Sequence, residues 1–143
     1  MPREGGVSYA AQESWCLSET IKANIIFGEP YDAERYQQVV SACGLEPDLK
    51  LFDDGDETEI GEKGVTLSGG QKARITLARA VYCKTDIVLL DGKRDLEMPL
   101  TTDIFSALDT LTSRWIIENL FKGPLMADRT VLLIVSERLW TRH

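Results

Sequence analysis

The sequence predicts an α/β fold built on a mainly parallel sheet. Two short apolar runs, residues 87–91 and 130–135, have the length and composition of buried parallel strands, and a third candidate strand lies at residues 7–10. Stretches with apolar side chains at helical spacing lie between these runs. Strands that alternate with helices are typical of parallel α/β folds, and 143 residues suffice for one such domain.

Local start and stop signals place the first helices. A short helix follows the strand at residues 7–10; it starts at residues 18–20 and stops before Gly28. Asp32 begins a clearer helix, which Gly44 ends. Its apolar face is most simply core and consists of Tyr36, Val39, Val40 and Cys43.

The second half of the chain contains the longest predicted helix, Gly69 to Tyr82. An acidic, glycine-punctuated loop at residues 52–64 leads to it. Asp109 is placed to cap a later helix that runs through Leu120. The long helix presents a slim face suited to close packing, formed by Ala73, Leu77 and Ala80.

Composition excludes several classes of function. Lys and Arg number 16 against 23 Asp and Glu, a net charge of −7, which argues against a nucleic-acid partner bound by charge. The one histidine is the last residue, His143, so histidine-ligated metal sites and histidine-dependent nucleophiles have almost no material. No apolar stretch approaches about 20 residues, so no membrane-spanning segment is expected. The cysteines are odd in number and widely spaced, which indicates reduced thiols in the cytoplasm: Cys16, Cys43 and Cys83.

The start of the long helix is a candidate phosphate site. Ser68 and Gln71 match a capping box, which explains the ends of the run but not its middle. Gly69 and Gly70 would occupy the first two helical positions, at a cost of roughly 1 kcal/mol each relative to alanine. Glycines there allow a ligand to approach the backbone, and free N–H groups at a helix start favour an anion.

The order of motifs resembles the nucleotide-binding domain of an ABC transporter, a P-loop NTPase fold. Residues 67–80 resemble the ABC signature and its helix, and residues 87–91 resemble the Walker B strand. Residues 106–109 resemble the D-loop, and Gln12 matches the Q-loop glutamine. Together with two intervening segments, residues 58–64 before the signature and residues 21–28 in the place of the coupling region, they resemble the first such domain of the multidrug-resistance-associated C subfamily.

The resemblance implies half of a composite site, in which two domains sandwich ATP. Ser68, Gly69, Gly70 and Gln71 would hold the γ-phosphate of ATP bound to a second nucleotide-binding domain. Asp109 would contribute through the D-loop, although it would also serve as a helix cap.

On the domain's own nucleotide side, the resemblance implies that Asp91 holds Mg²⁺ through water and that Gln12 contacts the metal or the attacking water. The alternatives are a cap at a strand end for Asp91 and a solvated loop amide for Gln12. Trp15 is expected to pack against a partner or the core rather than on nucleotide.

Three departures from the family pattern put ATP hydrolysis in doubt. No Gly-x-x-x-x-Gly-Lys-Ser/Thr occurs, so the Walker A loop is missing. Residues 92–102 separate Asp91 from Asp103, which takes the place of the catalytic carboxylate; removing them restores a continuous motif, so we expect an insertion, such as intron sequence read in frame. Ser136 stands where the switch histidine belongs and cannot supply its imidazole.

We therefore expect residues 1–143 to be a partial, N-terminally truncated nucleotide-binding domain. A helical subdomain with the signature would occupy residues 13–80, and remnants of the α/β core residues 5–12 and 84–136. In the intact family the domain hydrolyses ATP to drive solute export, with transmembrane domains as partners, on the cytoplasmic side of a membrane. The isolated chain is expected to be cytoplasmic and inactive, and marginally stable.

Two alternatives stay open. The first is a non-catalytic binding module, or gene remnant, that supplies only the signature half of a composite ATP site. The second is a non-transport ABC protein of DNA repair or translation, which long heptads or basic tracts should accompany; neither is visible.

Overall fold

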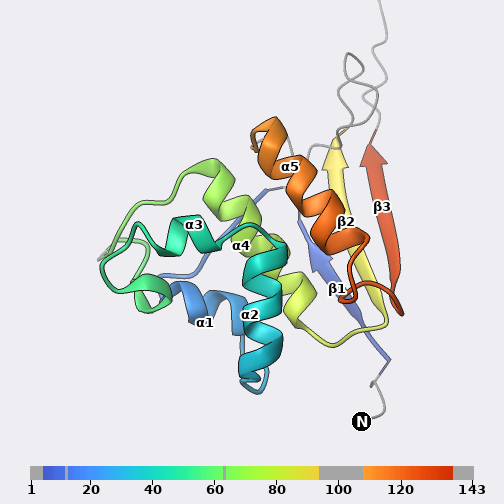
Figure 1. Cartoon of the computed structure of the whole chain (residues 1–143), viewed down its shortest axis with the longest axis horizontal. Coiled ribbons are helices and arrows are strands. Elements are labelled where there is room, and N and C mark those ends of the chain that lie inside the picture. Colours follow the sequence, from blue (N-terminus) through green and yellow to red (C-terminus); the bar gives the residue numbers. More distant parts are fainter. Residues whose placement is uncertain (1–4, 12, 63, 94–107, 137–143) are drawn as a thin grey trace, which may run out of the picture.

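A three-stranded parallel sheet stands at one side of the molecule, with helices packed against it (Figure 1). The computed structural model describes residues 5–11, 13–62, 64–93 and 108–136. The strands are β1 (Val7–Ala10), β2 (Ile87–Lys93) and β3 (Thr130–Ser136), in the order β1-β2-β3. Both strand pairs are parallel, which confirms the predicted sheet for the described strands.

The central strand β2 runs two residues beyond the predicted end at Asp91. Asp91 pairs with Ile134, and Lys93 still pairs with Ser136. The prediction that the acidic residue ends the strand was therefore wrong. The ladder continues because β3 supplies backbone partners past this point, and a side-chain pattern does not report them.

The helices begin where the capping signals place them. Thr20, Asp32, Ser68 and Asp109 each accept a hydrogen bond from the backbone N–H three residues ahead. The sequence analysis missed a short helix whose first turn contains Pro47, a usual helix-start signal. The elements are α1 (Ile21–Ile26), α2 (Ala33–Ala42), α3 (Glu46–Leu49), the 3₁₀ turn η1 (Gly55–Glu57), α4 (Gly69–Tyr82), α5 (Thr110–Ile116) and the π-helical η3 (Ile117–Phe121).

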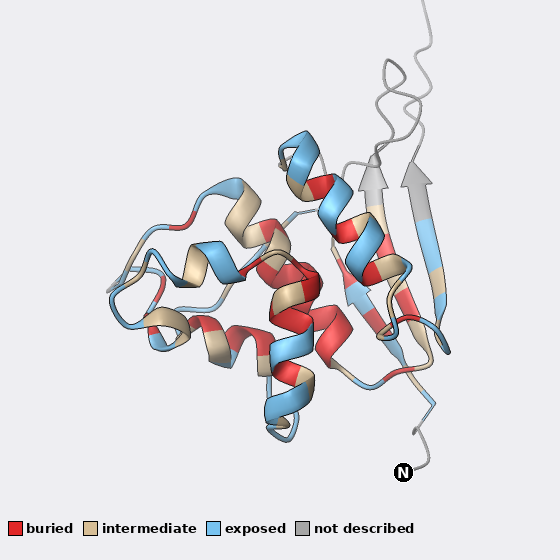
Figure 2. Cartoon of the chain, viewed as in Figure 1, coloured by how far each residue is buried: buried red, intermediate tan, exposed pale blue. Residues whose placement is uncertain are grey.

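Helix α4 is the centre of the core, and α1 and α2 pack against it (Figure 2). Its first turn is open to solvent, whereas Ile75 to Tyr82 are all buried. The predicted packing face of Ala73, Leu77 and Ala80 is buried, as is the predicted face of α2. Burial of apolar surface around α4 therefore holds the helical part together.

The two faces of the sheet differ in burial. Ser8, Ala10, Val88 and Leu90 are buried on the face toward the helices. Alternate residues point the other way, and Val7, Tyr9 and Leu132 are about half exposed there. Parallel sheets normally have both faces covered, so this apolar face is unusual for an α/β protein.

Arg129, just before β3, ties the strands to the end of α4. Its guanidinium donates hydrogen bonds to the carbonyl oxygens of Val81, Cys83 and Thr85 at 2.7–2.9 Å. It also donates to the Thr85 hydroxyl at 2.8 Å. These contacts fix the carboxyl end of the long helix against the sheet, and so they set where its amino end lies.

Within the ranges that the structure describes, no helix is long and apolar enough to cross a membrane. Gln12, Asp103 and most of the predicted insertion lie outside the described residues. For Ser136, the backbone pairing of β3 is described but not the side chain.

Candidate functional site at the start of helix α4

The capping box that the sequence predicts is present at the start of α4. The Gln71 N–H donates to Ser68 Oγ at 3.2 Å, and the Ser68 N–H donates to Gln71 Oε1 at 2.9 Å. Ser68 Oγ accepts in this arrangement, so its hydroxyl proton is still available for donation. The cap therefore leaves the serine able to bind a ligand oxygen.

The two glycines that follow Ser68 expose their backbone at the helix start. Gly69 and Gly70 are the first two residues of α4, where an α-helix supplies no internal partner for the N–H groups. Among the described residues, no hydrogen bond from the N–H of Gly69 or Gly70 is present. Neither glycine is buried. Together with the positive end of the helix dipole, these N–H groups have the chemistry that an anion requires.

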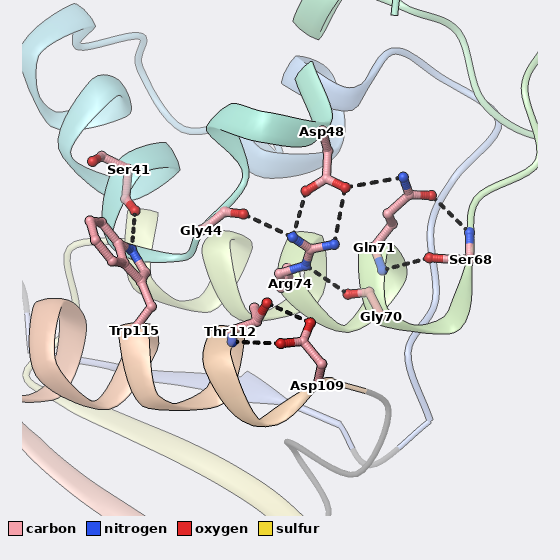
Figure 3. Close-up of polar contacts among 10 residues, drawn as sticks. All are labelled: Ser41, Gly44, Asp48, Ser68, Gly70, Gln71, Arg74, Asp109, Thr112 and Trp115. Carbon is pink, nitrogen blue, oxygen red and sulfur yellow. Dashed lines mark hydrogen bonds and ion pairs between the residues drawn. The ribbon is translucent and has the colours of Figure 1, made fainter. Parts of the chain in front are cut away.

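Arg74, one turn into α4, holds this helix start to the turn between α2 and α3 (Figure 3). Its Nε donates to the Gly70 carbonyl at 3.2 Å, and its Nη1 donates to the Gly44 carbonyl at 2.8 Å. Gly44 has a φ of +68°, a conformation that favours glycine. The arginine thus connects Gly70 to a turn 26 residues earlier.

Asp48 on α3 completes this support. Its carboxylate pairs with the Arg74 guanidinium, and the Asp48 and Arg74 side chains are only 14% and 13% exposed. Asp48 Oδ1 also accepts a hydrogen bond from Gln71 Nε2 at 3.2 Å (Figure 3). Both the oxygen and the nitrogen of the Gln71 amide therefore form hydrogen bonds within the chain. The roles of Asp48 and Arg74 were not predictable from the sequence, because no local pattern links residues this far apart.

Asp109 caps α5, as predicted. Its Oδ1 accepts from the Thr112 N–H at 2.9 Å, and its Oδ2 accepts from the Thr112 hydroxyl at 2.8 Å. These bonds lower the pKa of Asp109 from its ordinary value and keep the carboxylate charged at neutral pH. Asp109 and Arg74 line one cavity, so the structure brings the residue predicted as the D-loop aspartate near the start of α4.

Asp91 lies on β2, the strand next to β1. Tyr9 of β1 donates a 2.7 Å hydrogen bond to Asp91 Oδ2. The pKa of Tyr9 is raised because its proton is held by this carboxylate. Among the described residues, no group of three or more Asp, Glu, His or Cys side chains forms a metal cluster. Asp91 thus offers a single carboxylate, which suits Mg²⁺ only when nucleotide phosphates and water supply the other ligands.

Trp15 and Phe27 form an aromatic surface beside Arg79 of α4. The Arg79 guanidinium stacks over Trp15 at 3.9 Å and over Phe27 at 5.0 Å, measured to the ring centroids. The two rings meet edge to face at 5.6 Å. Both rings are nearly half exposed, so Trp15 packs on a buried arginine and still presents a surface for contact.

The family model for "ABC transporter" matches residues 2–93 of this chain. The chain is 54% identical over 134 residues to the ATP-binding cassette transporter abc4 of Schizosaccharomyces pombe, which covers 94% of this chain and 8% of that protein. It is 47% identical to the vacuolar heme ABC transmembrane exporter abc3 of the same organism, over 92% of this chain and 8% of that protein.

A further relative is the ABC transporter C family member 12 of Dictyostelium discoideum, which is 40% identical over 94% of this chain and 9% of its own length. The chain thus spans less than a tenth of the curated relatives it matches. It belongs to the ABC transporter family and corresponds to a piece of the P-loop NTPase-type nucleotide-binding domain of transporters like those of the C subfamily.

Proposed function

We propose that the chain supplies the signature half of a composite ATP site, which a second nucleotide-binding domain completes. Ser68, Gly69 and Gly70 would bind the γ-phosphate of ATP held by that second domain. The observation that carries this proposal is the pair of backbone N–H groups of Gly69 and Gly70, which have no hydrogen bond in the described part of the chain and belong to residues that are not buried. Gln71, whose amide is held at both ends, would position the site more than contact the ligand.

Chemistry on the chain's own nucleotide side has weaker support. The sequence contains no Walker A loop, and Asp91 is a single carboxylate engaged by Tyr9. With ATP bound through another segment, Asp91 would hold Mg²⁺ through water, and Gln12, Asp103 and Ser136 would occupy the positions of the attacking-water contact, the catalytic carboxylate and the switch residue. We therefore expect the isolated chain to be inactive as an ATPase.

The aromatic surface of Trp15 and Phe27 is the proposed contact with transmembrane domains. Relatives are named as exporters and permeases, and the sequence predicts the coupling region at residues 21–28. Large half-exposed aromatic rings over a fixed cation are typical of protein contacts. In an assembled exporter this surface would face the membrane from its cytoplasmic side.

The direct test is ATP-dependent association with a second domain. The probe is a purified C-subfamily nucleotide-binding domain with an intact Walker A loop, mixed with this chain in analytical ultracentrifugation, with and without ATP and Mg²⁺. We expect a heterodimer with ATP. We expect Gly70→Ala to weaken it at least about tenfold, because a Cβ would hold the phosphate off the backbone.

Helix stability separates this effect from misfolding. Alanine at position 70 should leave the folded chain as stable or more stable, by up to about 1 kcal/mol, since glycine disfavours helix. Glu19→Gln, an exposed change away from the site, is the matched control. Association that is independent of ATP, or equal for Gly70→Ala and the parent chain, would contradict the proposal.

A further inference from the structure

A cavity of about 500 Å³ lies between the α2–α3 turn, the start of α4 and the start of α5. Its size falls within the range of about 300–1,000 Å³ that is usual for small-molecule sites. Ser41 at the end of α2 and Gly44 in the turn border it, and so do Arg74 on α4 and Asp109, the N-cap residue of α5. Gly69 and Gly70 do not line this cavity, although it shares Asp109 with the predicted D-loop.

The cavity has an unusually apolar rim. Leu51 and Leu111 are 78% and 77% exposed, and Trp115 is 49% exposed, and all three line it. These are three of the large apolar side chains that the described surface leaves open to water. Such a cluster around one hollow is typical of a binding site rather than of scattered surface residues.

The indole of Trp115 is held in one orientation. Its Nε1 donates a 3.0 Å hydrogen bond to the Ser41 carbonyl, across from α5 to α2 (Figure 3). This contact uses the polar edge of the ring, and it leaves much of the apolar surface exposed. A fixed aromatic ring attracts a cation over its face without losing further conformational freedom.

The charges around the cavity favour a cation. Glu46, Asp48 and Asp109 carry three carboxylates, and Arg74 carries one guanidinium. Arg74 is already paired with Asp48 and bonded to two carbonyl oxygens. Glu46 and Asp109 are exposed, so their negative charges remain accessible to a ligand, although both Asp109 oxygens also accept hydrogen bonds from Thr112.

We propose that this cavity binds an organic cation with an apolar body, the ammonium group near Glu46 and Asp109 and the apolar body against Trp115, Leu111 and Leu51. The ring attracts the positive charge, the leucines cover the apolar part, and the carboxylates select against neutral and anionic molecules of the same shape. The inference stands on this cavity alone and does not depend on the proposed ATP site.

The test compares two probes of one shape, 2-naphthylmethylamine and 2-naphthylmethanol. Each is titrated into the full chain and followed by isothermal calorimetry and by two-dimensional NMR of the tryptophan side-chain N–H signals. We expect saturable one-to-one binding of the amine, with the Trp115 signal shifted, and binding of the alcohol weaker by about two- to five-fold or more. Higher salt should weaken binding of the amine but not binding of the alcohol.

Two variants locate the site. Glu46→Gln removes an exposed carboxylate and should weaken binding of the amine about two- to five-fold. Glu19→Gln makes the same charge change elsewhere and should leave binding of the amine unchanged. Trp115→Leu should weaken both probes. No saturable binding of the amine, equal binding of amine and alcohol, or equal effects of the two glutamate variants would overturn the proposal.

Discussion

Asp48 and Arg74 form a two-point ion pair: Arg74 Nη2 donates to Asp48 Oδ1 at 3.1 Å, and Nη1 faces Asp48 Oδ2. The pair contacts the first turn of α4. It connects three elements, α3 through the carboxylate, the α2–α3 turn through Gly44, and α4 through Gly70. Since the two glycines of the signature disfavour helix by themselves, this connection compensates for their flexibility.

Asp48→Asn should destabilise the chain by about 1–3 kcal/mol, because it leaves a largely buried guanidinium without its anion. Urea unfolding followed by circular dichroism measures the loss. Glu46→Gln, on the same short helix but exposed, is the matched control and should change stability by less than about 0.5 kcal/mol. Equal midpoints for the two variants would show that the ion pair contributes nothing.

Arg79→Lys should lower the free energy of unfolding by about 2 kcal/mol in spite of the retained charge. Arg79 donates to the Asn24 carbonyl at 2.8 Å and to Asn24 Oδ1 at 3.1 Å while it stacks on Trp15. A lysine has neither the planar fork nor the flat face for this arrangement. Thermal unfolding followed by circular dichroism is the measurement, and the exposed Arg114→Lys is the control. A loss no larger than that of the control would be the contrary result.

Cys43 should make the folded chain less stable at alkaline pH. Burial raises the pKa of its thiol to about 12, above the ordinary value. Because the folded pKa lies above the unfolded one, the contribution of the neutral thiol is complete below about pH 9 and is lost as the pH rises toward 12. Denaturant midpoints measured across this window should fall, and the fall should be smaller in Cys43→Ala.

The same burial predicts an order of thiol reactivity. Cys16 and Cys83 are partly exposed, so iodoacetamide at pH 8 should label them first and Cys43 last. Mass spectrometry of the labelled peptides gives the order. Early labelling of Cys43 in the folded chain would contradict the buried position.

The open face of the sheet should promote self-association. Leu132 lies on it with Tyr9, both about half exposed. Leu132→Lys should lower the fraction of dimers and larger species in sedimentation velocity, because charge on an apolar patch opposes its burial between copies. Leu17→Lys makes the same change at a similarly exposed leucine away from the sheet and serves as the control. The proposal fails if both substitutions act equally.

Local signals made much of the fold predictable. The capping residues and the apolar spacing located α1, α2, α4 and α5 but not α3, and the apolar runs located all three described strands. The capping box of Ser68 and Gln71 and the cap of Asp109 were predictable for the same reason, since each involves residues three apart. Four motifs in order then gave the family.

Contacts between distant residues were not predictable in this way. No pattern links Asp48 to Gln71, or Tyr9 to Asp91, because the fold alone brings them together. The extension of β2 past Asp91 likewise depends on a neighbouring strand that the local sequence does not identify. The roles of Gln12, Asp103 and Ser136 stay predictions.

The pairing of β1 with β2 also sets an order of folding. Ser8 and Thr85 lie 77 residues apart and meet at 2.9 Å. Closing so long a loop costs chain entropy before its contacts repay it, whereas α1, α2 and α4 lie within the intervening segment and make more local contacts. During synthesis, the helices can therefore assemble around α4 before β2 is available to pair with β1. The sheet is then the last part to form.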